Sequence, residues 1–214
     1  MTVRKEAGSS KDTWHAWDDL YRRQPRAWKG PAEDLQIEGV PGIALELGCG
    51  SGKTLLSLGA KRIVLAFDVS RAALIACRGD RRSENVELIQ GDAMRLPFAS
   101  ESLDIVVAHH ILGHLLADER KAAATEIARV LRPDRLLSIR VLAQGDMRAW
   151  GRKEVEPMTF AKGGVISHFF DEAEIKSLFP SFDVVRIGTT SLARRYGGVE
   201  MKRSEVIALL RSPA

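Results

Sequence analysis

The chain has 214 residues, 45% of them hydrophobic and 28% charged, a composition ordinary for a globular protein with one core. It contains no run of about 18 apolar residues, as a membrane span requires, and Met1–Glu6 lacks the apolar core of a signal peptide. Its two cysteines, Cys49 and Cys77, cannot form a disulfide framework or a metal site by themselves. We therefore expect a cytoplasmic protein without a membrane partner.

The net charge of +4 arises from 32 basic and 28 acidic residues. Such a mild excess permits contact with RNA without arguing for it. The basic pairs, among them Arg22-Arg23 and Arg194-Arg195, are scattered along the chain. A solvated surface is the simpler interpretation of them.

The N-terminal segment, residues 1–40, is expected to be helical and to precede the main domain, residues 41–214. Its aromatic residues Trp14, Trp17 and Tyr21 recur at spacings of three and four, which predicts an amphipathic helix. This helix could pack onto the domain, cover a ligand, or do both. A loop holding Trp28 and a short helix over Ala32–Glu38 are expected next.

A glycine-rich turn follows the first predicted strand. Ile43–Leu47 is typical of a buried parallel strand, and glycines follow at positions 48, 50 and 52. Glycines at such a turn let backbone N–H groups approach a ligand closely. The spacing fits neither a phosphate-binding P-loop nor a dinucleotide fingerprint.

The second predicted strand, Ile63–Phe67, ends at Asp68. In a βαβ unit an acidic residue there can accept hydrogen bonds from both ribose hydroxyls. Asp68 lies 68 − 48 = 20 positions after Gly48, and the usual offset is about 20. The glycine turn and Asp68 together predict a nucleoside site.

The rest of the chain continues an alternation of strands and helices, with one irregular stretch at 143–167. Ser70 is expected to cap a helix, and Asp171 with Glu174 to start another. A long irregular segment inside a compact domain is usually functional or mobile. The predicted helices are Lys53–Leu58, Arg71–Arg78 and Asp118–Leu131, and the predicted strands are Val86–Gln90, Leu103–Ala108, Leu136–Leu142 and an antiparallel pair, Phe182–Ile187 with Ser204–Leu210.

Three histidines, His109, His110 and His114, follow the fourth predicted strand. They lie where ligands bind in a doubly wound sheet, beyond the carboxyl ends of the strands. A zinc site would need a further ligand, and no nearby carboxylate completes the set. We expect no metal.

Several segments carry a family resemblance. Glu46-Leu47-Gly48-Cys49-Gly50-Ser51-Gly52 resembles the E/D-x-G-x-G-x-G signature of class I S-adenosylmethionine (SAM)-dependent methyltransferases. Gly91-Asp92-Ala93 with Leu96-Pro97-Phe98 is similar to the family's G-D-A…L-P-F stretch. Residues 129–136 resemble its R-V-L-K-P-G-G turn, with Asp134-Arg135 in place of the two glycines. The resemblance covers residues 43–142 strongly and 168–211 in outline.

The resemblance implies a fold and a cofactor. The fold would be a Rossmann-like, doubly wound α/β sheet of seven mostly parallel strands with a C-terminal antiparallel pair. The cofactor would be S-adenosyl-L-methionine. The residues that the resemblance assigns to cofactor binding are Glu46, Gly48, Cys49, Gly50, Gly52, Asp68, Val69, Asp92, Ala93 and His109.

The resemblance also implies methyl transfer to an N, O or S atom, most simply of a small-molecule acceptor. Residues 143–167 would then wall the acceptor side. The candidates for a general base are His110, His114 and His168. An RNA- or protein-modifying methyltransferase and a non-catalytic SAM-binding protein remain alternatives.

Overall fold

The structure, a computed structural model, describes residues 10–26, 35, 37, 40–58, 62–79, 86–196 and 198–214. The predicted loop at Trp28 lies outside these residues. So does the predicted helix over 32–38, except for Leu35 and Ile37, which are both buried.

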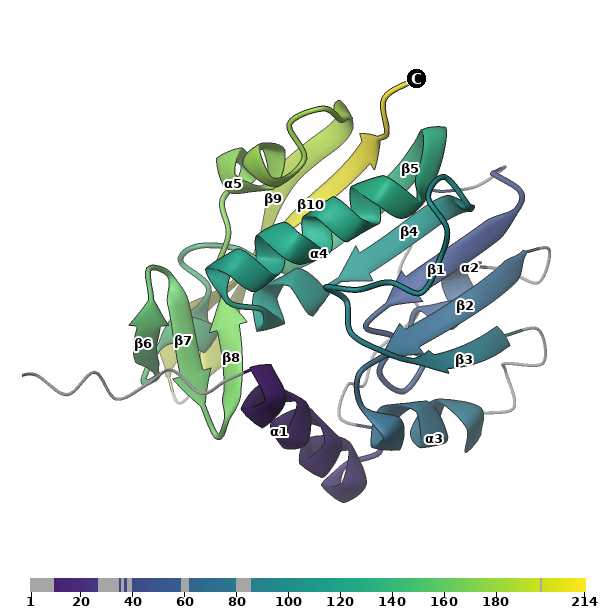
Figure 1. Cartoon of the computed structure of the whole chain (residues 1–214). Helices are drawn as coiled ribbons and strands as arrows, with labels where there is room; N and C mark the ends of the chain where they lie inside the picture. Colours follow the sequence, from purple (N-terminus) through teal and green to yellow (C-terminus); the bar gives the residue numbers. More distant parts are fainter. Residues whose placement is uncertain are drawn as a thin grey trace, which may run out of the picture.

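The central element is a seven-stranded sheet in the order β3-β2-β1-β4-β5-β10-β9 (Figure 1). The first five of these strands are parallel, and β10 is antiparallel to both β5 and β9. This confirms the predicted doubly wound sheet with its C-terminal antiparallel pair. The strands are β1 (Ile43–Leu47), β2 (Ile63–Asp68), β3 (Val86–Gln90), β4 (Leu103–His109), β5 (Leu131–Leu142), β9 (Asp183–Tyr196) and β10 (Val199–Arg211).

Helices cover both faces of this sheet. Successive residues of a strand point to opposite faces, so Leu45 joins one apolar cluster and Ala44 the other. The first cluster packs α4 and α5, and the second packs α2 and α3. The described helices are α1 (Ser10–Arg23), α2 (Leu55–Leu58), α3 (Arg71–Gly79), α4 (Ala117–Val130), α5 (Glu172–Leu178) and two short 3-10 helices, η1 (Ile111–His114) and η2 (Met147–Ala149).

The segment at 143–167 differs from the expectation of an irregular loop. Its second part forms a three-stranded antiparallel sheet of β6 (Lys153–Glu156), β7 (Thr159–Lys162) and β8 (Val165–His168) (Figure 1). Gly163 and Gly164 have φ angles of 61° and 81°, as a tight hairpin turn requires. The irregular-loop prediction was wrong because these strands are short and carry several charged residues, which hides their alternation.

Several element boundaries also differ from the predictions, most of all in the antiparallel pair, where β9 continues to Tyr196 rather than Ile187 and β10 begins at Val199 rather than Ser204. Strand β5 begins at Leu131 rather than Leu136, and α2 begins at Leu55 rather than Lys53. Asp134, which replaces a glycine of the family turn, has a φ of 57°. Aspartate tolerates this left-handed conformation better than most residues, so the turn keeps its shape without glycine.

Asp104 links the amino ends of the strands β1, β4 and β5 through its side chain. Its carboxylate accepts a hydrogen bond from Ile43 N at 2.9 Å and pairs with Arg132 at 2.7 Å and with Arg135 at 3.1 Å. Burial raises the pKa of Asp104, but these partners outweigh it, and the pKa lies below its ordinary value. This cluster lies at the edge of the sheet away from the glycine turn.

Among the described residues, no helix is both long and apolar enough to cross a membrane.

Candidate cofactor and acceptor site

The glycine turn after β1 is held in a conformation that favours glycine. Gly48, Gly50 and Gly52 have φ angles of 76°, 53° and 83°. The backbone N–H groups of Gly48 and Cys49 both donate to Phe67 O, at 2.8 and 3.0 Å, which ties the turn to β2. A Cβ on Gly48 would lie 2.9 Å from Cβ of Ile111, and one on Gly50 would lie 2.3 Å from the Tyr21 hydroxyl oxygen. Larger residues would therefore disrupt the turn.

Asp68 joins this turn to the start of α3. Its Oδ2 accepts a hydrogen bond from Gly50 N and its Oδ1 accepts one from Ser70 N, both at 2.8 Å. Burial raises the pKa of Asp68, and the hydrogen bonds from Ser70 and Gly50 offset part of that rise. A carboxylate oxygen accepts more than one hydrogen bond, so both oxygens retain acceptor capacity for hydroxyl groups.

The other predicted cofactor residues lie at the same carboxyl edge of the sheet. Gly91 N donates to Asp68 O at 3.1 Å, which brings the loop after β3 next to the end of β2. In that loop, Asp92 Oδ1 accepts from Met94 N at 2.9 Å and Ala93 is buried. Val69 is half-buried directly after β2, and Glu46 is buried in β1.

Cys49 has a packing role in this turn. It is 4% exposed and hydrogen-bonds with the buried Cys77 of α3, which together with burial raises the pKa of the Cys49 thiol well above its ordinary value. A protonated, buried thiol is chemically inert. Cys49 thus contributes its backbone to the turn and its side chain to the core.

Helix α1 crosses the glycine turn and reaches both sides of it. At one side, Asp18 Oδ1 accepts from Ser70 Oγ and from Ala72 N, each at 2.9 Å. At the other side, the Trp17 ring lies edge-on to the His114 ring with centroids 4.6 Å apart. Tyr21, one turn after Trp17, lies over Gly50. The helix therefore packs on the domain and lies over the turn, and its role as a cover for a ligand stays a prediction.

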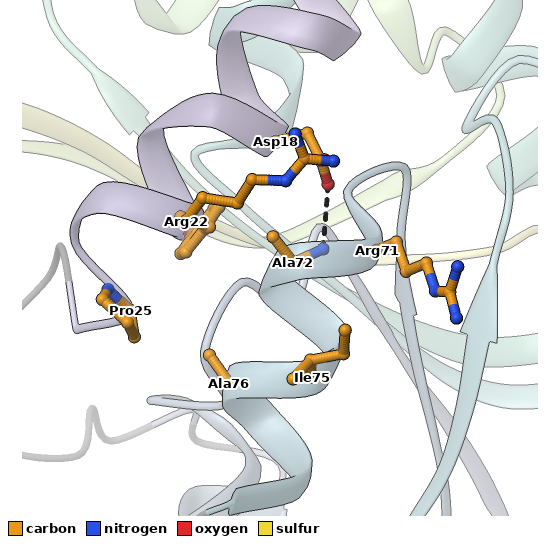
Figure 2. A pocket seen from close by; sticks show the side chains of 8 residues that line it. Asp18, Arg22, Pro25, Arg71, Ala72, Ile75 and Ala76 are labelled. Carbon is orange, nitrogen blue, oxygen red and sulfur yellow. Dashed lines mark hydrogen bonds and ion pairs between the residues drawn. The ribbon is translucent and has the colours of Figure 1, made fainter.

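Figure 2 shows the groove where α1 meets α3. Its volume is about 350 Å³, and in the view Arg22 lies beside Asp18 while Arg71 points away from it. None of the residues assigned to the cofactor or to proton transfer lines this groove. The groove marks the outer side of the α1 contact rather than the cofactor position.

The α1 contact is expected to loosen in an Asp18→Ala variant. Asp18 accepts two hydrogen bonds from the start of α3, and losing them costs about 1 kcal/mol or more. We expect trypsin to cleave after Arg22 and Arg23 roughly fivefold faster in the variant. Asp19→Ala removes a more exposed carboxylate from the same helix and should leave the cleavage rate unchanged.

The same contact should depend on pH. Burial raises the pKa of Asp18, but the hydrogen bonds from Ala72 and Ser70 outweigh burial and hold it below 3.8. A carboxyl group with a depressed folded-state pKa stabilises the fold above its unfolded-state pKa, and that stabilisation is lost as pH falls through the folded-state value. Equal rates of trypsin cleavage in the original chain and in the Asp18→Ala variant at neutral pH would contradict this role of Asp18.

The candidate histidines fall into two groups. His109 and His114 lie at the end of β4 and in η1, and His110 lies between them with a φ of 65°. His109 Nε2 hydrogen-bonds with Ser138 Oγ at 3.0 Å, and His110 N donates to Arg140 O at 2.6 Å. Because the partner of His114 Nδ1 is the Ile166 carbonyl oxygen, at 2.7 Å, Nδ1 donates, which leaves the lone pair on Nε2.

His168 lies apart from these and is 3% exposed. Its Nδ1 hydrogen-bonds with Thr159 Oγ1 at 2.7 Å, and its Nε2 with Glu174 Oε2 at 2.8 Å. Both ring nitrogens are therefore used to hold β7, β8 and α5 together. Across the described ranges, no group of three or more metal-ligating side chains comes together.

His114 should make the stability of the fold pH-dependent. Burial lowers its pKa to about 4, more than the hydrogen bond to Ile166 raises it. Between pH 6.5 and 4 the unfolded chain binds a proton that the folded chain does not, so stability falls as pH decreases over that range. For this half-buried ring we expect a loss on the order of 2 kcal/mol.

The measurement is urea unfolding at a series of pH values, compared with a His114→Gln variant. Glutamine keeps a donor for Ile166 O and does not titrate. The variant should show a flatter dependence between pH 6.5 and 4. Equal slopes in the two proteins would show that His114 titrates normally.

The site fits an adenosyl cofactor in the chemistry of its groups. The turn has no room for Cβ atoms at Gly48 and Gly50, and Asp68 supplies a buried carboxylate at the end of β2. Asp92 and Ala93 follow β3 at the same edge. A carboxylate suits two ribose hydroxyls, and a glycine turn suits close backbone approach.

Comparison with known proteins agrees with this geometry. A family model described as a methyltransferase domain matches residues 45–139. The O-methyltransferase rstn1 of Aspergillus nomiae is 34% identical over 106 residues, covering 44% of this chain and 44% of the relative. The tRNA (carboxymethyluridine(34)-5-O)-methyltransferase of Arabidopsis thaliana is 30% identical over 118 residues, covering 54% of this chain and 28% of the relative.

The chain thus spans less than half the length of these curated relatives. Among solved structures, a SAM-dependent methyltransferase from Methanosarcina mazei has a TM-score of 0.68 at 23% identity, covering 80% of this chain and 92% of that one. At this identity the likeness shows the fold.

The motifs now lie in one place: the glycine turn after β1, the acidic end of β2 and the loop after β3 meet at one sheet edge, inside the region that matches the methyltransferase-domain model. The cofactor of such domains is S-adenosylmethionine. Residues 45–139 of the chain thus match the methyltransferase-domain family, and the fold is that of SAM-dependent methyltransferases.

Proposed function

We propose that this chain transfers a methyl group from SAM to an N, O or S atom of a small-molecule acceptor. The observation that carries the proposal is the convergence on Gly50, whose N–H donates to Asp68 and where the Tyr21 hydroxyl leaves no room for a Cβ atom. The acidic end of β2, the glycine turn and the helix that covers them therefore meet at one residue. The end of β4, with its histidines, opens beside them.

The residues that would hold the cofactor are those of the glycine turn, with Asp68 for the ribose and Asp92 and Ala93 for the adenine. When bound, SAM supplies an electrophilic methyl group on a sulfonium centre. The task of the chain is then to align an acceptor atom and exclude water, and alignment can contribute about 7–11 kcal/mol. Helix α1, which covers the turn through Tyr21 and Trp17, suits the exclusion of water.

An amine or hydroxyl acceptor must also lose a proton. We propose His110 and His114 for this step, because both lie directly after β4. His114 is neutral at pH 7 and has its lone pair on Nε2, as a proton acceptor needs. In His168 both ring nitrogens are hydrogen-bonded and buried, which favours a positioning role for that residue.

The first alternative is an RNA- or protein-modifying methyltransferase, and of its two kinds of substrate RNA has the more support. The similarity to a plant tRNA methyltransferase favours it, although this chain covers 28% of that protein. The basic pairs scattered along the sequence are the other support. A non-catalytic SAM-binding role is the second alternative.

One experiment separates these functions. The protein is incubated with methyl-labelled SAM and a cell extract that has been divided into small-molecule, RNA and protein fractions. We expect label in the small-molecule fraction. Label confined to RNA would establish the first alternative, and binding of SAM by calorimetry without any transfer would establish the second.

A further inference from the structure

The acceptor side of the molecule carries a set of charged residues that the sequence did not single out. Asp146 pairs with Arg148 at 2.8 Å, Arg148 with Glu205 at 3.3 Å, and Glu205 with Arg140 at 3.4 Å. We refer to these four residues as the charged row. It runs from η2 to β10 and β5 beyond the carboxyl end of β5. The negative charges of its two carboxylates cancel the positive charges of its two guanidinium groups.

Arg152 lies next to the charged row but forms no ion pair with either of its carboxylates. It precedes β6 and donates from Nη1 to Ser167 Oγ of β8 at 3.1 Å. In the part of the chain that the structure describes, no carboxylate lies within ion-pair distance of Arg152, whereas Arg148 has two. Arg152 is half-buried, and its burial and the neighbouring charge of Arg148 lower its pKa more than the charge of Asp146 raises it.

A half-buried guanidinium that has only a neutral hydroxyl partner is unfavourable in the protein alone. Arginine presents five N–H donors in a planar fork that matches a carboxylate. Ser167 accepts from one of its nitrogens. The Arg152 guanidinium therefore carries a positive charge and N–H donors arranged to bind an oxyanion.

Arg152 lies near His114, because its partner Ser167 follows Ile166, whose carbonyl oxygen accepts a hydrogen bond from His114 Nδ1. The charge of Arg152 reaches His114, where after burial and the Ile166 hydrogen bond it is the third influence on the pKa. The His114 ring packs on Trp17, and Trp17 on Tyr21, with centroids 4.6 and 6.2 Å apart. Tyr21 in turn lies over Gly50 of the glycine turn. A ligand held by Arg152 would therefore lie near His114, one of the two histidines proposed to accept the proton.

We propose that Arg152 binds a carboxylate of the methyl acceptor, so that the acceptors of this chain are organic acids. This inference rests on the proposed function, which it narrows from small molecules in general to acids. Arg152 acts as a specificity residue in it. Ser167 holds one side of the guanidinium so that the other side is presented to the ligand.

The test compares matched pairs of ligands, each an aliphatic or aromatic carboxylic acid and its primary amide. The amide has nearly the same shape but no charge. Binding to the full chain is measured by ligand-detected NMR and calorimetry, with and without S-adenosylhomocysteine. We expect at least one acid to bind about tenfold tighter than its amide, because a charge-assisted pair with arginine is lost in the amide.

Variants then assign the preference to Arg152. Arg152→Gln should bring acid and amide to within about twofold, and Arg152→Lys should retain part of the preference. Arg211→Gln is the matched control, since Arg211 pairs with Asp134 at 3.0 Å near the start of β5. That control should keep the full preference.

The proposal is overturned if no acid binds better than its amide, or if Arg152→Gln leaves the preference unchanged. S-adenosylhomocysteine binding separates this result from the proposed function. Arg152→Gln should bind the nucleoside as the original chain does. If the original chain fails to bind it, the proposed function fails, while the acid and amide comparison without nucleoside still decides the role of Arg152.

Discussion

Replacing Asp68 with alanine is expected to weaken SAM binding by about 1–3 kcal/mol, a roughly 5- to 150-fold rise in Kd. Asp68 is 9% exposed at the carboxyl end of β2. Its loss removes the proposed acceptor of the ribose hydroxyls. It also removes the acceptor for Gly50 N and Ser70 N, which shape the glycine turn and the start of α3.

Calorimetry with SAM and with S-adenosylhomocysteine measures this effect. Asp118→Ala is the control, because the Asp118 side chain is fully exposed on α4. Circular dichroism should show that both variants remain folded. A folded Asp68→Ala protein with an unchanged Kd would refute the assignment of the cofactor site.

Replacing Asp104 with alanine is expected to lower the free energy of unfolding by about 2–4 kcal/mol. The side chain of Asp104 is 8% exposed, and its loss leaves Ile43 N without its acceptor at the start of β1. The side chains of Arg132 and Arg135 are 41% and 42% exposed, so water can solvate much of their charge. Most of the cost should therefore come from the half-buried backbone N–H of Ile43.

Urea unfolding at neutral pH measures this loss. Asp134→Asn serves as the control, because Asp134 is 61% exposed and asparagine tolerates its left-handed backbone. The folded-state pKa of Asp104 lies below 3.8, so its contribution is present above that pH and is lost as pH falls through the folded-state value. The folded Asp104→Ala protein should bind SAM normally, since Asp104 lies at the opposite edge of the sheet. A difference in stability that persisted in strong acid would contradict this account.

Much of the parallel sheet could be predicted from local patterns. Strands such as Ile63–Asp68 are buried on both faces and read as continuous apolar runs. The glycines at 48, 50 and 52 indicated a turn, and they do adopt positive φ angles. Asp68 and Asp92 could be placed at one sheet edge because parallel strands align their carboxyl ends.

Local patterns failed where short strands pair through turns. Residues 153–168 carry too few apolar residues to show an alternation, and their sheet depends on hairpin turns and on packing beside η1. The residues that α1 contacts could not be predicted from the sequence either. Nothing in the sequence near Asp18 indicates that it accepts hydrogen bonds from Ser70 and Ala72.

The sequence by itself determined the order of the motifs, and with it the sheet, the match to the methyltransferase-domain family and the residues proposed to bind the cofactor, because each of these depends on residues close together in the chain. Only the tertiary structure decided which side chains lie around Arg152, the residue proposed to bind the acceptor. Arg152, Ser167, His114 and Trp17 come from four separate segments, and their contacts exist only after β8, η1 and α1 have packed together. That Arg152 has no carboxylate within ion-pair distance among the described residues also follows from this packing, because residues far apart in the sequence decide which side chains lie near it.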